Sequence, residues 1–181
     1  MFIATVMMTS LVIQQGKWND QLVVSTQAYE MAMMIRQAQI YALGVKENTF
    51  AGASNADKFN VGYGVYFDVN SKISYKFFAD VNGDKKYNEG TDNVIEPVPL
   101  KSGVEISDVC GVSKCFFAGG GPLQKASIVF YRPETKANIL LTNFGGTEKD
   151  DPTLTIQLKS PKGELYSVKV EANGKISVGP I

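Results

Sequence analysis

The sequence predicts an α+β fold, in which one long N-terminal helix packs on a C-terminal antiparallel β domain. Up to Val45, small and apolar residues recur at steps of three and four, which is the period of a helix. After residue 60, short segments alternate between apolar and polar residues, and no second helical pattern separates them. We therefore divide the 181 residues into a helix over 1–46 and a β-rich domain over 47–181.

The first part of the helix, residues 1–20, opens with thirteen uncharged residues, Met1 to Ile13. A secretory signal has a basic segment before its apolar core, and a membrane-spanning helix needs about 20 apolar residues, so this segment fits neither pattern. A helix of about 45 residues is about 70 Å long, so its apolar end should protrude from the domain. We expect an assembly and membrane surface there, with burial inside the β domain as the alternative. The residues of this surface are Phe2, Ile3, Val6, Met7, Leu11 and Val12.

The second part of the helix, residues 21–46, is amphipathic. Polar residues such as Gln27, Glu30 and Arg36 lie between its apolar positions, which predicts a single dry face packed on the sheet. Gly16 and Asn19 weaken the helix near the join of the two parts. The apolar positions are Val24, Ala28, Met31, Ile35, Ala38, Ala42 and Val45.

The β domain should consist of short strands joined by tight turns. In the first strand, alternate large residues from Val61 to Val69 share one face, as in a half-buried strand. Asn173 and Gly174 form a step favoured in two-residue hairpins. The expected strands are 61–69, 72–79, 94–100, 104–106, 126–132, 137–142, 154–159, 166–171 and 175–178.

The composition argues against two classes of function. Eighteen basic and eighteen acidic residues give a net charge of zero, whereas nucleic-acid-binding proteins usually carry a basic excess. The chain has no histidine, the commonest general base, and no arrangement of its serines and carboxylates resembles a catalytic triad. We therefore expect neither a nucleic-acid partner nor an enzyme.

The two cysteines, Cys110 and Cys115, are separated by four residues. A redox CxxC motif has two intervening residues, and a zinc site needs more cysteine or histidine ligands than this chain has. The sequence favours a local disulfide, which implies an oxidising compartment. Two free, buried thiols are the alternative.

An acidic segment after the second expected strand resembles a calcium-binding loop. Asp80, Asn82 and Asp84 offer oxygen ligands at alternating positions, as a hard cation requires. The EF-hand pattern then has glycine at its sixth position and glutamate at its twelfth, where this chain has Lys85 and Thr91. Calcium is therefore the one candidate cofactor, and none is expected to be required. The alternative is a solvated turn, because Asp, Asn and Gly are common turn formers.

The order of these elements resembles type IV pilins and the minor pseudopilins of type II secretion. The helix segment AYEMAMMIRQAQIYALGVKE resembles that of pilin-like precursors. The segments GYGVYFDVN and YKFFADVNGDKKYNEGTD resemble the first hairpin of the minor pseudopilins. Their closing strands are similar to IVFYRPETKANI and TIQLKSPKGELYSVKVEANGKISV.

The resemblance implies a structural subunit of a type IV pilus-like filament or a secretion pseudopilus. Its partners would be further copies or other pilin-like subunits, first in the inner membrane and then in an extracytoplasmic or extracellular filament. The family's basic leader, Gly-Phe cleavage site and helix glutamate are not in this sequence, so Met1 to Ile13 resembles the second half of the family's apolar helix. A surface-anchored β domain that binds a ligand with calcium is the alternative function, and an extracytoplasmic hydrolase is the weakest.

Overall fold

The computed structural model describes residues 2–44, 61–116 and 123–181, with side chains from residue 19 onward. Helix α1 (Phe2–Leu43) precedes all the strands. Every pair of neighbouring strands is antiparallel, so the expected α+β architecture is confirmed. The strands described are β1 (Gly62–Asp68), β2 (Ser74–Asp80), β3 (Asn93–Pro99), β4 (Glu105–Cys110), β5 (Leu123–Phe130), β6 (Ala137–Asn143), β7 (Glu148–Asp150), β8 (Thr153–Lys159), β9 (Leu165–Glu171) and β10 (Ile176–Pro180).

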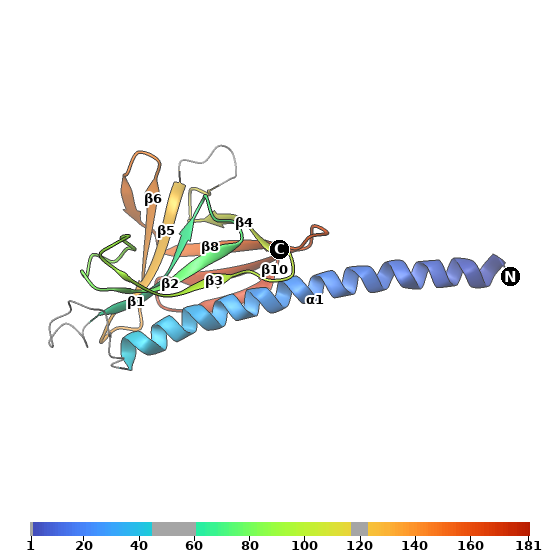
Figure 1. Ribbon diagram of the computed structural model, residues 1–181, viewed down its shortest axis with the longest axis horizontal. Helices are drawn as coiled ribbons and strands as arrows, with labels where there is room; N and C mark the ends of the chain where they lie inside the picture. Colours follow the sequence, from blue (N-terminus) through green and yellow to red (C-terminus); the bar gives the residue numbers. More distant parts are fainter. Residues whose placement is uncertain (1, 45–60, 117–122) are drawn as a thin grey trace.

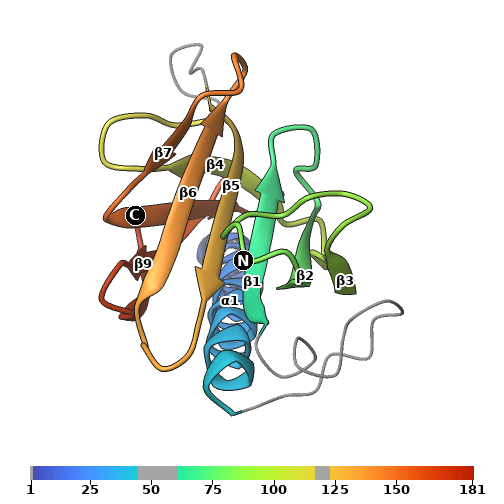
Figure 2. The same ribbon diagram turned by 90° about the vertical axis from the view of Figure 1, so that its left-hand side faces the viewer.

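The strands form two sheets. The six-stranded sheet has the order β3-β2-β1-β5-β6-β7, and the four-stranded sheet has the order β10-β9-β8-β4. Figure 2 shows β1, β5 and β6 side by side in the larger sheet. The edge strand β3 carries Pro97 and Pro99, which have no N–H group to offer a further strand.

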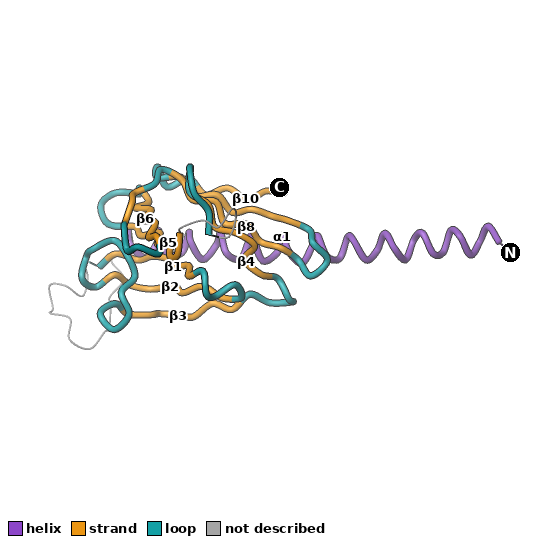
Figure 3. Tube along the Cα trace, turned by 90° about the horizontal axis from the view of Figure 1, so that it is seen from above, coloured by secondary structure: helices purple, strands orange, loops and turns teal. Residues whose placement is uncertain are grey.

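Helix α1 contains 42 residues, and at about 1.5 Å per residue it is about 63 Å long. Its C-terminal half lies against both sheets, and its N-terminal half projects well beyond them (Figures 1 and 3). The helix continues through Gly16 and Asn19, so the weak positions near the join do not interrupt it. It ends at Leu43, where the N–H of Gly44 donates a 2.8 Å hydrogen bond to the Ile40 carbonyl.

The apolar stripe predicted for the second part of α1 is buried between the helix and the sheets. We call its described members the inner stripe: Val24, Ala28, Met31, Ile35, Ala38 and Ala42. All six belong to one continuous core that includes residues of both sheets. Val45, the last residue of the predicted stripe, lies outside the described residues. The helical period therefore identified the intramolecular face of α1 correctly.

Strand β1 is buried on both faces, whereas the alternation of its residues predicted one buried face. Its second face carries Tyr66, which packs in a small cluster with Phe78 and Val129. Tyr87, from the segment that follows β2, covers this cluster with its ring 4.7 Å from that of Tyr66. The acidic segment therefore covers part of the outer face of the six-stranded sheet.

Strand β7 was not predicted from the sequence. Its three residues, Glu148 to Asp150, are charged and exposed, so they show no alternation. They form a strand because they pair with Leu140 to Thr142 of β6. A strand this short depends on its neighbour rather than on its own residues.

Gly64 should not tolerate a side chain, because a methyl group there would lie 2.3 Å from the carbonyl oxygen of Ile128 in the paired strand. We expect Gly64→Ala to lower the free energy of unfolding by about 1–3 kcal/mol, as overpacking does. Gly179→Ala is the matched control, since nothing lies within 4 Å of the added methyl group in β10. Urea unfolding monitored by circular dichroism measures both. Equal stability of the two variants would contradict the close approach of β1 and β5.

Candidate functional site

The side of α1 opposite the inner stripe is also apolar. Leu22 is 62% exposed, Met33 71% and Ile40 59%, and Tyr29 lies on the same line. These positions are seven, four and seven residues apart, so they fall on one line of the helix surface. We call these four residues the outer stripe. Helix α1 therefore buries one face, as predicted, and carries on its opposite side a second apolar line that is exposed.

Two grooves flank the outer stripe. The larger, of about 650 Å³, lies between α1 and the edge of the six-stranded sheet. Its apolar lining includes Met34 and Tyr41 from the helix and Val98 and Leu100 from the sheet side. The smaller, of about 260 Å³, lies between α1 and β10. Met33 lines both grooves, so the outer stripe is a ridge between two hollows.

Polar contacts fix the rotation of α1 on the domain. The Gln27 side-chain oxygen accepts a 2.9 Å hydrogen bond from the N–H of Lys101. Near the other end, the Gln39 amide donates to the carbonyls of Thr135 and Gly174, at 3.0 and 3.4 Å. Because these glutamines lie beside the inner stripe, they keep the outer stripe turned away from the sheets.

A further contact lies where α1 leaves the domain. The buried Asp20 carboxylate accepts a hydrogen bond from the hydroxyl of Ser160, in the turn between β8 and β9. The same hydroxyl accepts a 2.9 Å bond from the N–H of Glu164. This contact joins the base of the protruding half of α1 to the four-stranded sheet.

The predicted assembly residues lie in the protruding half of α1. The structure describes their backbone as helical, and their side chains lie outside the described residues. Their role in assembly therefore stays a prediction. Across the part of the chain that the structure describes, no helix is both long and apolar enough to span a membrane.

The acidic loop brings three carboxylates together. One oxygen each from Asp80, Asp84 and Asp92 lies within 4.8 Å of the others. Asp92 lies one residue beyond the twelfth position of the EF-hand pattern and was not among the predicted ligands. Asn82, a predicted ligand, accepts a 3.1 Å hydrogen bond from the N–H of Asp84.

The two buried carboxylates of this loop hold the loop in place. Asp80 accepts hydrogen bonds from the N–H groups of Gly83 and Lys85, at 2.8 and 2.7 Å, and from the Tyr131 hydroxyl. Asp92 accepts one bond from each of two loop N–H groups, at 3.0 and 2.7 Å. Burial raises the pKa of both carboxyl groups, although these hydrogen bonds oppose the shift. Three clustered oxygen donors suit calcium, and calcium binding stays a prediction.

The cysteine pair expected from the sequence is joined in the structure. A disulfide links Cys110, the last residue of β4, to Cys115, and the two residues also form an isolated antiparallel bridge. Phe116, the next residue, is buried in the core. The disulfide therefore closes a short hairpin at the end of β4.

The fold of this chain is similar to that of a known protein. No protein-family model matches the chain, and no curated protein matches it significantly. Among solved structures, the chain is similar to the minor pseudopilin EpsH from the type II secretion system of Vibrio cholerae. The two share 16% identity at a TM-score of 0.46, and the match covers 89% of this chain and 96% of that one.

Removal of the Asp20 carboxylate should destabilise the domain. Asp20→Ala would leave the Ser160 hydroxyl buried without this partner, which costs about 1–3 kcal/mol in free energy of unfolding. Asn19→Ala, at the exposed neighbouring position, is the control and should leave stability unchanged or slightly higher. Urea unfolding of both variants provides the measurement. An unchanged free energy of unfolding for Asp20→Ala would contradict the contact between Asp20 and Ser160.

Calcium should raise the melting temperature of protein stripped with a chelator, because a ligand that binds the folded state stabilises it. Asp84→Asn should abolish that rise, since it removes the exposed carboxylate of the cluster. Asp150→Asn, an exposed carboxylate of β7, is the control and should keep it. Melting curves without and with millimolar calcium measure the effect. An unchanged curve for the wild type would leave the loop as a turn held by its own hydrogen bonds.

Proposed function

We propose that this protein is a structural subunit of a filament of the type IV pilus or secretion-pseudopilus kind, and that it assembles through α1. The observation that carries the proposal is the outer stripe. Three of its four residues are about 60% exposed or more, although each is a large apolar side chain. Exposed apolar surface of this kind marks an interface, and a helix that is apolar on two sides needs cover on both.

The shape of the molecule supports the same proposal. The outer stripe is exposed on the side of α1 opposite the inner stripe. The protruding half continues the same helix beyond the β domain (Figure 1). We propose that a second copy covers this side with another surface of its own helix. Contacts between unlike surfaces build an open helical assembly when the rotation between copies does not close a ring.

The proposed mechanism is mechanical rather than chemical. The inner stripe, Asp20, Gln27 and Gln39 fasten the helix to both sheets, so a pull on the helix reaches the β domain. The precursor would be held in the inner membrane through the apolar residues 1–13, and the assembled filament would be extracytoplasmic. The disulfide suits such an oxidising compartment. We propose no enzymatic activity.

A charge on the outer stripe should block assembly without unfolding the domain. We expect Met33→Glu to abolish self-association of the full chain, because a carboxylate buried without a partner costs several kcal/mol. Val6→Asp, in the protruding half, should do the same. Val112→Glu is the matched control, since Val112 is 67% exposed in the cysteine hairpin rather than on the helix. Electron microscopy and analytical ultracentrifugation report assembly, and circular dichroism reports folding.

A truncated chain completes this test. Deletion of residues 1–19 removes the protruding half just before the Asp20 contact, and it should give a monomer that keeps its β structure. A wild-type chain that stays monomeric would refute the filament and favour the surface-anchored ligand-binding domain. Assembly of Met33→Glu at wild-type levels would show that the outer stripe is not an assembly surface. Unfolding of the truncated chain would instead show that the domain needs residues 1–19 in order to fold.

A further inference from the structure

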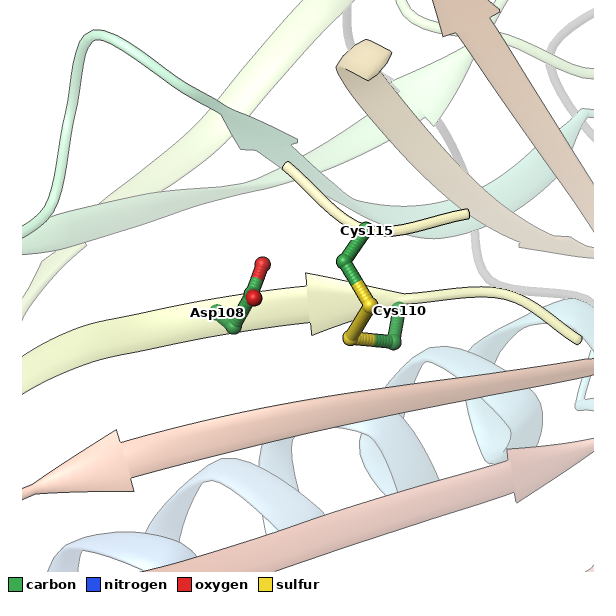
Figure 4. A group of neighbouring side chains, drawn as sticks. All are labelled: Asp108, Cys110 and Cys115. Atoms are coloured by element: carbon green, nitrogen blue, oxygen red, sulfur yellow. A yellow bond between two sulfur atoms is a disulfide. The ribbon is translucent and has the colours of Figure 1, made fainter. Parts of the chain in front are cut away.

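Three side chains with metal-binding atoms meet at the end of β4. One ligand atom each from Asp108, Cys110 and Cys115 lies within 4.8 Å of the others (Figure 4). Asp108 and Cys110 are two residues apart on the same strand, so their side chains lie on the same face. Cys115 lies opposite Cys110 in the antiparallel bridge, and residues paired in this way also share a face. The path of the backbone therefore places all three side chains on one face of the hairpin.

The hairpin that holds the two cysteines together has supports besides the disulfide. The N–H of Gly111 donates to the Lys114 carbonyl at 2.8 Å, and the N–H of Phe116 donates to the Val109 carbonyl at 3.0 Å. On one side, β4 is paired along its length with β8. On the other, the Phe116 side chain is anchored in the core. The two cysteines therefore stay opposite each other when the bond between them is reduced.

We propose that reduction of this disulfide creates a binding site for a borderline-soft divalent cation, represented by zinc. Its protein ligands are the thiolates of Cys110 and Cys115 and the carboxylate of Asp108. Thiolate and carboxylate are both established zinc ligands, and water supplies the fourth position of the tetrahedron. Two cysteines without histidine are too few for the usual zinc site, which is why the sequence predicted none. The fold adds Asp108 to the pair as a third ligand.

The chemistry balances in two steps. A dithiol reductant gives two electrons and two protons to the disulfide, whose S–S bond breaks into two thiols while the reductant becomes a disulfide itself. Zinc then displaces the two thiol protons and forms two Zn–S bonds. While the S–S bond is intact, neither sulfur carries the charge that binds zinc, so the oxidised hairpin has no such site.

The geometry of the reduced hairpin suits the cation. Two thiolates on tetrahedral zinc lie about 3.8 Å apart, and side-chain rotation reaches that separation from two cysteines whose Cα atoms lie 4.0 Å apart. Asp108 is buried, and its carboxylate accepts a 2.8 Å hydrogen bond from the N–H of Val109. Such a bond orients a ligating carboxylate. A cation also offsets the repulsion among three neighbouring anionic groups.

Metal binding to the full chain tests the proposal. The protein is reduced with a phosphine, freed of reductant by anaerobic gel filtration, and titrated with zinc against a chelating dye. We expect one additional equivalent of zinc in the reduced protein relative to the oxidised protein. That comparison subtracts any zinc held by the carboxylates of the acidic loop, which do not change with redox state. Equal binding in the two states would overturn the proposal.

Two variants and one spectrum identify the ligands. Asp108→Asn should weaken zinc binding to the reduced protein at least about tenfold, whereas the control Asp150→Asn should bind like the wild type. Cobalt in place of zinc reports coordination in the unmutated chain, so its result does not depend on the folding of a variant. We expect sulfur-to-cobalt charge-transfer bands and the intense visible bands of a tetrahedral site. Absence of the charge-transfer bands, or wild-type affinity in Asp108→Asn, would refute the assigned ligands.

Discussion

The inner stripe of α1 packs against both sheets at once, and this contact positions the other elements. Three of its six residues are alanines, so the backbone of α1 can approach the strands closely. The six-stranded and four-stranded sheets share one core, and the C-terminal half of α1 provides part of that core. Without this contact, each sheet would expose an apolar face. The outer stripe faces away from the domain because the inner stripe and the two glutamines fix the rotation of the helix.

Local periodicity was enough to predict the helix, its buried face and most strands, because these features depend on neighbouring residues. The outer stripe was not predicted because Leu22, Met33 and Ile40 are interspersed with polar residues, so they form a weaker pattern than the inner stripe. Asp92 and Asp108 were not among the predicted ligands for another reason. Asp92 lies one residue beyond the EF-hand spacing and meets Asp80 and Asp84 only because the loop folds back on itself, and Asp108 joins the cysteines only once they pair across the hairpin.

The acidic loop illustrates how one segment can have two physical roles. Its apolar residue Tyr87 covers the outer face of β1 and β2, and the Lys76 ammonium lies 4.6 Å from the centre of that ring. Its buried carboxylates accept hydrogen bonds from the loop backbone and keep the cover in place. A solvated turn, the alternative considered from the sequence, does not describe a segment whose carboxylates Asp80 and Asp92 are buried.

The two prolines of β3 have a consequence for how copies of this protein can join. An open strand edge is a template on which foreign strands can grow, and aggregation into cross-β fibres starts at such edges. Pro97 and Pro99 remove two N–H donors from the edge that borders the larger groove. Copies of the protein could therefore pack beside that groove without pairing strands across the β3 edge. At this edge, two neighbouring copies would therefore meet as separate folded bodies rather than through one shared sheet.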